Sequence, residues 1–142
     1  MRRALPLLLV LTLVGCKGNR EKEVVGTWKA GQGTVTITEA KTFTTAVKTA
    51  VGEMKLEGPW TMEGNDITLS PKTLNGRSIA DLKPQIQKTL PMIPADKRAQ
   101  AESFVKDLDT PNVLTLSDDG KTLTTNKEKD KNSGPAMTLT KG

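Results

Sequence analysis

The sequence predicts a mainly β domain: an antiparallel up-and-down barrel or strongly curved sheet of about eight strands, with a helical hairpin inserted near residues 78–108. Through most of the chain after residue 24, apolar residues alternate with threonine or charged residues, which is the period of half-buried strands. Short breaks rich in Gly, Asn and Asp separate these runs and favour turns between antiparallel neighbours. Only residues 78–108 depart from the pattern, with apolar residues three and four apart.

The first fifteen residues are typical of a removable export signal. Arg2 and Arg3 precede an apolar stretch over residues 4–14. This stretch is too short for a membrane-spanning helix, which needs about 20 apolar residues, but it has the length of a signal-peptide core. We therefore expect residues 1–15 to be removed on export.

The segment Leu13-Val14-Gly15-Cys16 resembles the lipobox of bacterial lipoproteins. The resemblance implies cleavage before Cys16 and transfer of a diacylglyceryl group to its thiol. The alternative is an ordinary secretory signal that carries a cysteine by chance, but Cys16 is the only cysteine. Two or more acyl chains hold a protein stably in a bilayer. The resemblance thus predicts a palmitate-type lipid anchor at Cys16 and a place in the bacterial cell envelope.

Lys17 follows the predicted anchor. In enterobacterial lipoproteins an aspartate there favours retention in the inner membrane, so Lys17 favours the outer membrane if the host is Gram-negative. Residues 16–23 contain many charges and no bulky apolar residue. We expect them to form a flexible lipidated tether that reaches about 15 Å, with a single β domain over residues 24–142.

In eight segments, apolar residues recur at every second position, as in half-buried strands. A bend or bulge is expected within the fourth, because Gly58-Pro59 interrupts the alternation there. The abundant threonines suit the outer face, since their β-branch favours extended backbone while the hydroxyl stays in water. The eight segments are residues 24–30, 34–38, 42–48, 53–62, 66–70, 112–117, 121–126 and 136–141. Turns are expected at residues 31–33, 63–66 and 117–120.

Residues 78–108 predict two helices. Apolar side chains fall on a first stripe and then on a second, and prolines separate the two. Ser78 is a plausible N-cap, and Pro94 suits the first turn of the second helix. Pro84 predicts that the first helix is kinked or begins near Lys83. The stripes are Ile79, Leu82, Ile86 and Leu90, then Ala101, Phe104, Val105 and Leu108.

Gly26-Thr27-Trp28 opens the first strand and resembles the Gly-X-Trp signature of lipocalins and lipocalin-like domains. Trp60, after Gly58-Pro59, and the hairpin over residues 116–123 are also usual in small bacterial lipocalin-like lipoproteins. In that family the first tryptophan closes one end of an up-and-down barrel. The helical hairpin departs from a standard lipocalin, whose helix follows the barrel, so closure and a ligand cavity stay open questions at this point.

The composition excludes several kinds of chemistry. The chain has no histidine and no cysteine besides Cys16, which excludes histidine acid–base catalysis, thiol nucleophiles, intramolecular disulfides and ordinary zinc sites. We expect no enzymatic activity and no cofactor. Two tryptophans and two phenylalanines cannot build a stacking surface for single-stranded nucleic acid, so no nucleic-acid partner is expected.

Acidic residues near the end of the second helix and in the 117–120 turn raise the alternative of a calcium site. Their spacing fits no known loop, and turn formation and a helix exit explain them better, so no metal is expected. These residues are Asp107, Asp109, Asp118 and Asp119. Residues 127–131 alternate in charge and predict a solvated loop, the alternative being a patch for anionic lipid headgroups.

Two functional hypotheses follow. The first is a membrane-anchored, non-enzymatic binding module that buries a small apolar ligand inside the barrel, with the hairpin tip as a lid. The second is a structural or interaction protein whose core is filled and whose surface contacts another envelope protein. An exposed hairpin tip would favour the second. The residues expected to bind the ligand are Phe43, Met54, Trp60, Met62, Leu90, Met92 and Ile93.

Overall fold

The computed structural model describes residues 20–142 except residues 32, 50–51 and 133–135. The expected signal peptide, the lipobox and Cys16 lie outside the described residues. Among the described residues, no helix is long and apolar enough to cross a membrane.

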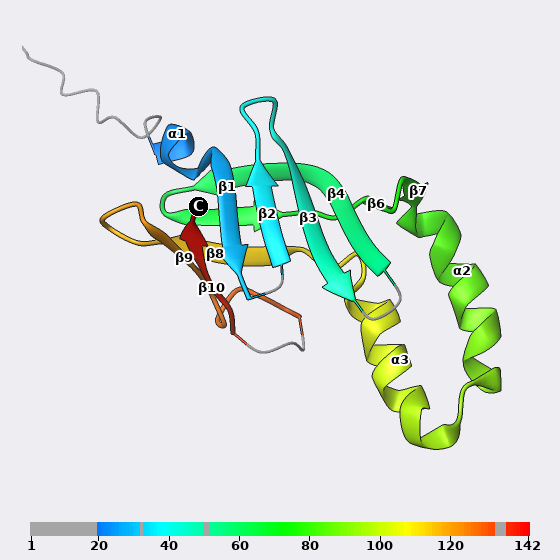
Figure 1. The fold of residues 1–142 in the computed structure, drawn as a ribbon. Helices are drawn as coiled ribbons and strands as arrows, with labels where there is room; N and C mark the ends of the chain where they lie inside the picture. The colour runs from blue at the N-terminus through cyan, green and yellow to red at the C-terminus, as the bar shows by residue number, and fades with distance from the viewer. Residues whose placement is uncertain (1–19, 32, 50–51, 133–135) are drawn as a thin grey trace, which may run out of the picture.

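Eight antiparallel strands close into a barrel (Figure 1). Each strand pairs with its neighbours along the chain, and β10 returns to pair with β1, which is the up-and-down order that the sequence predicts. All eight predicted strands are confirmed. They are β1 (Gly26–Ala30), β2 (Gly33–Ile37), β3 (Thr42–Thr49), β4 (Gly52–Glu63), β5 (Asp66–Leu69), β8 (Asn112–Leu116), β9 (Thr122–Thr125) and β10 (Thr138–Lys141).

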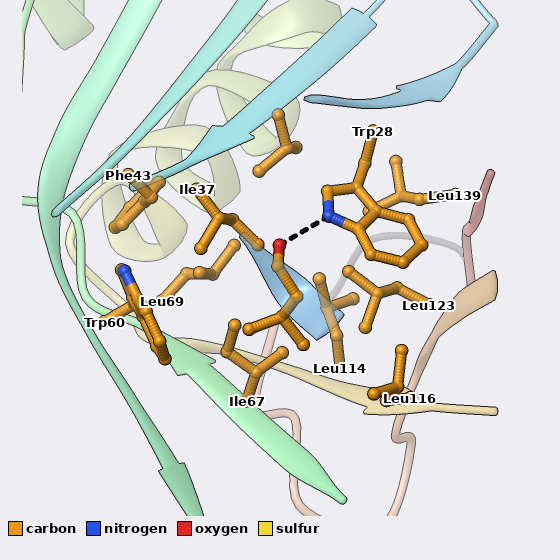
Figure 2. Packing of buried hydrophobic residues seen from close by; sticks show 12 residues of the cluster. Trp28, Ile37, Phe43, Trp60, Ile67, Leu69, Leu114, Leu116, Leu123 and Leu139 are labelled. Atoms are coloured by element: carbon orange, nitrogen blue, oxygen red, sulfur yellow. Dashed lines mark hydrogen bonds between the residues drawn. The ribbon is translucent and has the colours of Figure 1, made fainter. Parts of the chain in front are cut away.

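The barrel interior is occupied by the protein's own apolar side chains, with Trp28 and Trp60 among the largest (Figure 2). In β2, Val35 and Ile37 are buried while Thr34 and Thr36, which alternate with them, are partly exposed, as the two-residue period requires. The core cluster is Val24, Trp28, Val35, Ile37, Phe43, Trp60, Ile67, Leu69, Leu114, Leu116, Leu123 and Leu139.

β4 changes partner at its centre. Its first part pairs with β3 as far as Pro59, and its second part, from Trp60, pairs with β5. Gly58 sits at the change, and a Cβ atom there would lie 2.0 Å from the carbonyl oxygen of Ser70. Only glycine allows the two backbones to approach this closely. β4 itself runs without a break through Gly58-Pro59, so the interrupted alternation there corresponds to this change of partner.

Two short strands extend the sheet beyond the barrel: β6 (Thr73–Leu74), which pairs with β4, and β7 (Arg77–Ser78). Asn75 and Gly76 join them with positive φ angles of 50° and 79°, as a tight two-residue turn requires. The alternation of apolar and polar residues does not predict this hairpin, because its strands are only two residues long, although Asn-Gly is a strong turn signal.

The predicted helical hairpin is confirmed and lies in the connection between β5 and β8 (Figure 1). It consists of α2 (Ile79–Thr89), the short 3-10 turn η1 (Leu90–Met92) and α3 (Ala95–Asp107). Ser78 holds the N-cap position of α2 but makes no side-chain cap hydrogen bond, and Pro84 lies inside that helix. Near its base the hairpin buries Ile79, Leu82, Val105 and Leu108.

A short helix, α1 (Arg20–Val24), precedes the barrel. This corrects two boundaries, because the flexible tether was expected to reach residue 23 and the first strand to begin at Val24. Val24 is fully buried, and its carbonyl oxygen accepts a 2.8 Å hydrogen bond from Trp28 Nε1. The folded body therefore begins no later than Arg20.

Candidate functional site

The barrel has two distinct ends. Because neighbouring strands are antiparallel, successive connections alternate between the ends. The β2–β3, β4–β5 and β8–β9 turns share one end, which we call the α1 end because α1 contacts all three. The β5–β8 connection, which contains the helical hairpin, lies at the opposite end. Figure 1 shows α1 and the hairpin on opposite sides of the barrel.

Hydrogen bonds fix α1 to the barrel. Arg20 donates through Nη1 to the Asn65 side chain and through Nη2 to the carbonyl oxygen of Ser117, 2.7 Å away. Lys141 Nζ donates to the carbonyl oxygen of Glu23 at 2.7 Å. These contacts, with the buried Val24, make α1 a plug at this end of the barrel.

A pocket of about 330 Å³ opens beside α1, and we call it the Trp60 pocket. Trp60 is buried, and its Nε1 donates to the carbonyl oxygen of Thr38 at 2.9 Å. The Lys41 ammonium lies 4.2 Å from the centre of the Trp60 ring, within cation–π range, and forms an ion pair with Glu21. The pocket is lined by Glu21, Lys22, Val25, Glu39, Lys41 and Trp60.

Two rim charges of this pocket are unpaired. Lys22 and Glu39 are exposed, and neither has a hydrogen-bond or ion-pair partner for its side chain among the described residues. Within the part of the chain that the structure describes, the pocket therefore offers a cation and a carboxylate without partners, beside the half-buried Val25 and the buried Trp60.

Four of the expected ligand-binding residues lie on β3 and β4. Phe43 and Trp60 are both 2 % exposed within the core, and Met62 packs against it. Met54 is half-buried near the start of β4. The structure thus brings Phe43, Trp60 and Met62 together, but as parts of the packed core.

The other three expected residues, Leu90, Met92 and Ile93, lie at the tip of the helical hairpin. Met92 is 85 % exposed, and Leu90 and Ile93 are half-buried. The tip is at the end of the hairpin that is farther from the barrel (Figure 1). The structure therefore corrects the expected position of the lid: because the helices extend outward, the tip covers neither end of the barrel.

A polar cluster surrounds Asp66, at the start of β5. One carboxylate oxygen accepts hydrogen bonds from Thr115 Oγ1 at 2.8 Å and Asn126 Nδ2 at 3.3 Å, and the other accepts from Lys129 Nζ at 2.6 Å. The hydrogen bond from Lys129 is the main reason that the pKa of Asp66 is lowered, and burial opposes it. The cluster ties the loop after β9 to the barrel wall.

The acidic residues weighed as a calcium site are dispersed. Asp109 forms a 2.6 Å ion pair with Lys83 of α2. Asp119 accepts hydrogen bonds from Ser117 Oγ and from the backbone of Lys121 within the β8–β9 turn. Across the part of the chain that the structure describes, no three Asp, Glu, His or Cys side chains gather to hold a metal ion.

Sequence reasoning missed most of the Trp60 pocket. Lys41 adopts a positive φ of 64°, a conformation usual for Gly or Asn, so its position over Trp60 had no sequence signal. Glu21 and Lys22 belong to the charged segment that predicts a flexible tether, whereas they lie in α1. Trp60 itself was expected at a barrel mouth or in the core, and it lines the pocket while being buried.

By its fold, the chain is a closed, eight-stranded antiparallel β-barrel with an inserted helical hairpin. No family model and no curated protein matches the chain. An uncharacterized protein from Bacteroides eggerthii has a solved structure that is similar to it with a TM-score of 0.48 and 11 % sequence identity. That match covers 84 % of this chain and 99 % of the other.

Proposed function

We propose that this protein is a non-enzymatic, lipid-anchored interaction module of the bacterial cell envelope. In this proposal Cys16 carries the anchor, the barrel is a filled scaffold, and the helical hairpin contacts another envelope protein. The observation that carries it is the contrast between Trp60, 2 % exposed inside the barrel, and Met92, 85 % exposed at the hairpin tip.

The hairpin tip has a defined shape. Arg98 Nη2 donates to the carbonyl oxygens of Pro91 and Ile93, at 3.2 Å in both cases. Thr89 Oγ1 donates to the carbonyl oxygen of Ile86 at 2.7 Å. Because the backbone of this turn is already ordered, binding there does not have to order the loop, which favours recognition.

The charges beside the tip indicate the chemistry of the partner. Lys88 lies in the last turn of α2, and Lys97 and Arg98 lie in the first turns of α3, against one acidic residue, Asp96. We therefore expect a protein with an apolar recess for Met92 and acidic side chains around it.

Site-specific photo-crosslinking in the native host tests the proposal. A photoreactive amino acid at position 92 should give one discrete protein adduct, and the double substitution of Met92→Ser and Ile93→Ser should abolish partner recovery. The matched control is position 124, because Thr124 is exposed on the barrel wall. An absence of adducts at position 92, or the same adducts at both positions, would contradict the proposal.

The lipid anchor is tested separately. The wild-type chain should incorporate labelled palmitate, be cleaved after Gly15 and stay with the envelope at high salt. Cys16→Ala should lose the label and the cleavage, because the thiol is the proposed acceptor. Processing after residue 15 and retention of Cys16→Ala in the envelope would contradict the anchor.

Capture of a small apolar ligand is the second candidate function, and the presence of Val25 and Trp60 among the residues that line the Trp60 pocket supports it. Titration with a fatty-acid panel should then shift the fluorescence of Trp60. No shift in either tryptophan, with the barrel shown to be folded, would count against this candidate.

A further inference from the structure

We propose that the Trp60 pocket binds the headgroup of a membrane phospholipid that carries both a phosphate and a primary amine. This inference rests on the proposed lipid anchor at Cys16. It goes beyond the hairpin interaction, because it assigns a ligand to the opposite end of the barrel.

The position of the pocket supports a lipid of the anchoring bilayer. Four residue steps separate Cys16 from Arg20, and a fully extended chain of that length spans at most about 14 Å. Arg20 is fixed to the barrel by its hydrogen bonds to Asn65 and Ser117. Since Glu21 and Lys22 follow directly and line the pocket, an acylated Cys16 holds the pocket close to the headgroup layer.

The charges of the pocket match a zwitterion. Lys41 is held in place by its ion pair with Glu21 and by the Trp60 ring. Together with the unpaired Lys22, it can bind a phosphate from two sides. The unpaired Glu39 can accept hydrogen bonds from a primary amine.

The size of the pocket and its apolar residue Val25 fit the rest of the headgroup. A volume of about 330 Å³ is at the lower end of the range for small-ligand sites. Trp60 is 2 % exposed and the Lys41 ammonium lies over its ring, so the ligand's carbon atoms would pack chiefly on the half-buried Val25.

The same charges give selectivity. Phosphatidylglycerol presents a phosphate without an amine, which leaves the Glu39 carboxylate unpaired beside a second negative charge. A carboxylate without a cationic partner next to the phosphate weakens the binding of phosphatidylglycerol. The pocket should therefore prefer phosphatidylethanolamine to phosphatidylglycerol.

Tryptophan fluorescence of the intact acylated protein in vesicles tests the assignment. In vesicles of phosphatidylglycerol alone, added glycerophosphoethanolamine should shift the Trp60 emission saturably, while the fully buried Trp28 supplies a constant background. In vesicles that contain phosphatidylethanolamine, the shift should already be present and the soluble compound should add nothing. If glycerophosphoethanolamine does not shift the Trp60 emission in phosphatidylglycerol vesicles, the pocket does not bind the headgroup. If it causes the same shift in both kinds of vesicle, the ligand of the pocket is not a lipid of the bilayer.

Charge variants test the named contacts. Glu39→Gln and Lys22→Gln should each weaken binding of glycerophosphoethanolamine about tenfold, as expected for the loss of one charge-assisted hydrogen bond. Both side chains are exposed, so circular dichroism should show an unchanged fold. Lys48→Gln and Glu102→Gln are matched controls, because they remove exposed charges outside the pocket. Both variants should bind glycerophosphoethanolamine with the affinity of the wild type. Wild-type affinity in Glu39→Gln would contradict the proposed amine contact.

The outcomes separate this inference from the proposed function. If the wild-type protein carries no palmitate label at Cys16, there is no anchor, and the bilayer is no longer the source of the ligand. A correctly labelled protein without a fluorescence shift would remove only the headgroup site. Crosslinking at position 92 depends on neither result.

Discussion

Trp28 Nε1 donates a 2.8 Å hydrogen bond to the carbonyl oxygen of Val24, and both residues are completely buried (Figure 2). The bond joins the end of α1 to the centre of the barrel. It gives the tryptophan of the Gly-X-Trp segment a definite role, because the indole satisfies a backbone carbonyl that the sheet does not pair.

Trp28→Phe should lower the free energy of unfolding by about 1–3 kcal/mol, since a buried carbonyl oxygen loses its donor. Urea denaturation followed by circular dichroism measures the change. The neighbouring Thr27→Ser, on the exposed face of β1, should change stability by less than about 0.5 kcal/mol. If Trp28→Phe is as stable as the wild type, the bond does not hold α1.

Gly58→Ala should destabilise the barrel strongly. The new Cβ would lie 2.0 Å from the carbonyl oxygen of Ser70, a backbone atom that cannot rotate away. Overpacking of this kind costs about 1–3 kcal/mol or more, and thermal denaturation would report it. Gly33→Ala is the matched control, because its Cβ would meet neighbours at ordinary distances of 3.5–3.6 Å. Equal melting temperatures of the two variants would refute the close approach.

Asp66 should make stability depend on pH. Its pKa is lowered in the folded protein, chiefly by the hydrogen bond from Lys129, so the ionised carboxylate stabilises the fold at neutral pH. This contribution is lost as the pH falls below about 4, where the unfolded chain binds the proton first. The stability difference between the wild type and Asp66→Asn should therefore be largest near pH 7 and shrink in acid.

Urea denaturation at several pH values measures that difference. Glu102→Gln is the control, because it removes an exposed carboxylate and should give a profile parallel to that of the wild type. A difference that grows on acidification would have the wrong sign for a lowered pKa.

Substitutions in the hairpin should separate its base from its tip. Ile79→Ala should cost about 2–5 kcal/mol, because Ile79 is 1 % exposed at the base. Met92→Ser should change the free energy of unfolding by less than about 0.5 kcal/mol, because Met92 is 85 % exposed. A large loss of stability in Met92→Ser would mean that Met92 serves folding rather than recognition.

The strands could be predicted from the sequence because each has one buried face and one solvent-exposed face. The alternation of Val35 and Ile37 with threonine reports that environment directly. The helices could be predicted for the same reason, from the stripe that begins with Ile79 and Leu82. A stripe, however, predicts only that one face is covered, so it could not indicate that the hairpin points away from the barrel.

The site was harder to predict because its contacts join distant parts of the chain. Lys41 meets Glu21 across 20 residues, and Asp66 meets Lys129 across 63. Such pairs leave no local pattern. Val24 likewise has the sequence signal of a strand residue. An apolar residue next to a strand gives the same signal whether it belongs to the strand or, like Val24, ends a helix that covers one end of the barrel.

We propose that the α1 end of the barrel faces the bilayer and that the hairpin tip is presented away from it. Energy transfer between a fluorophore on the acylated protein and acceptor lipids in the vesicle tests it most directly. Lys22→Cys and Met92→Cys each provide one free thiol for labelling, because Cys16 is the only native cysteine and is acylated in this account. The label at position 92 should lie farther from the membrane than the label at position 22 by at least about 20 Å, the length of a 13-residue helix. Equal transfer from both positions would contradict the claim.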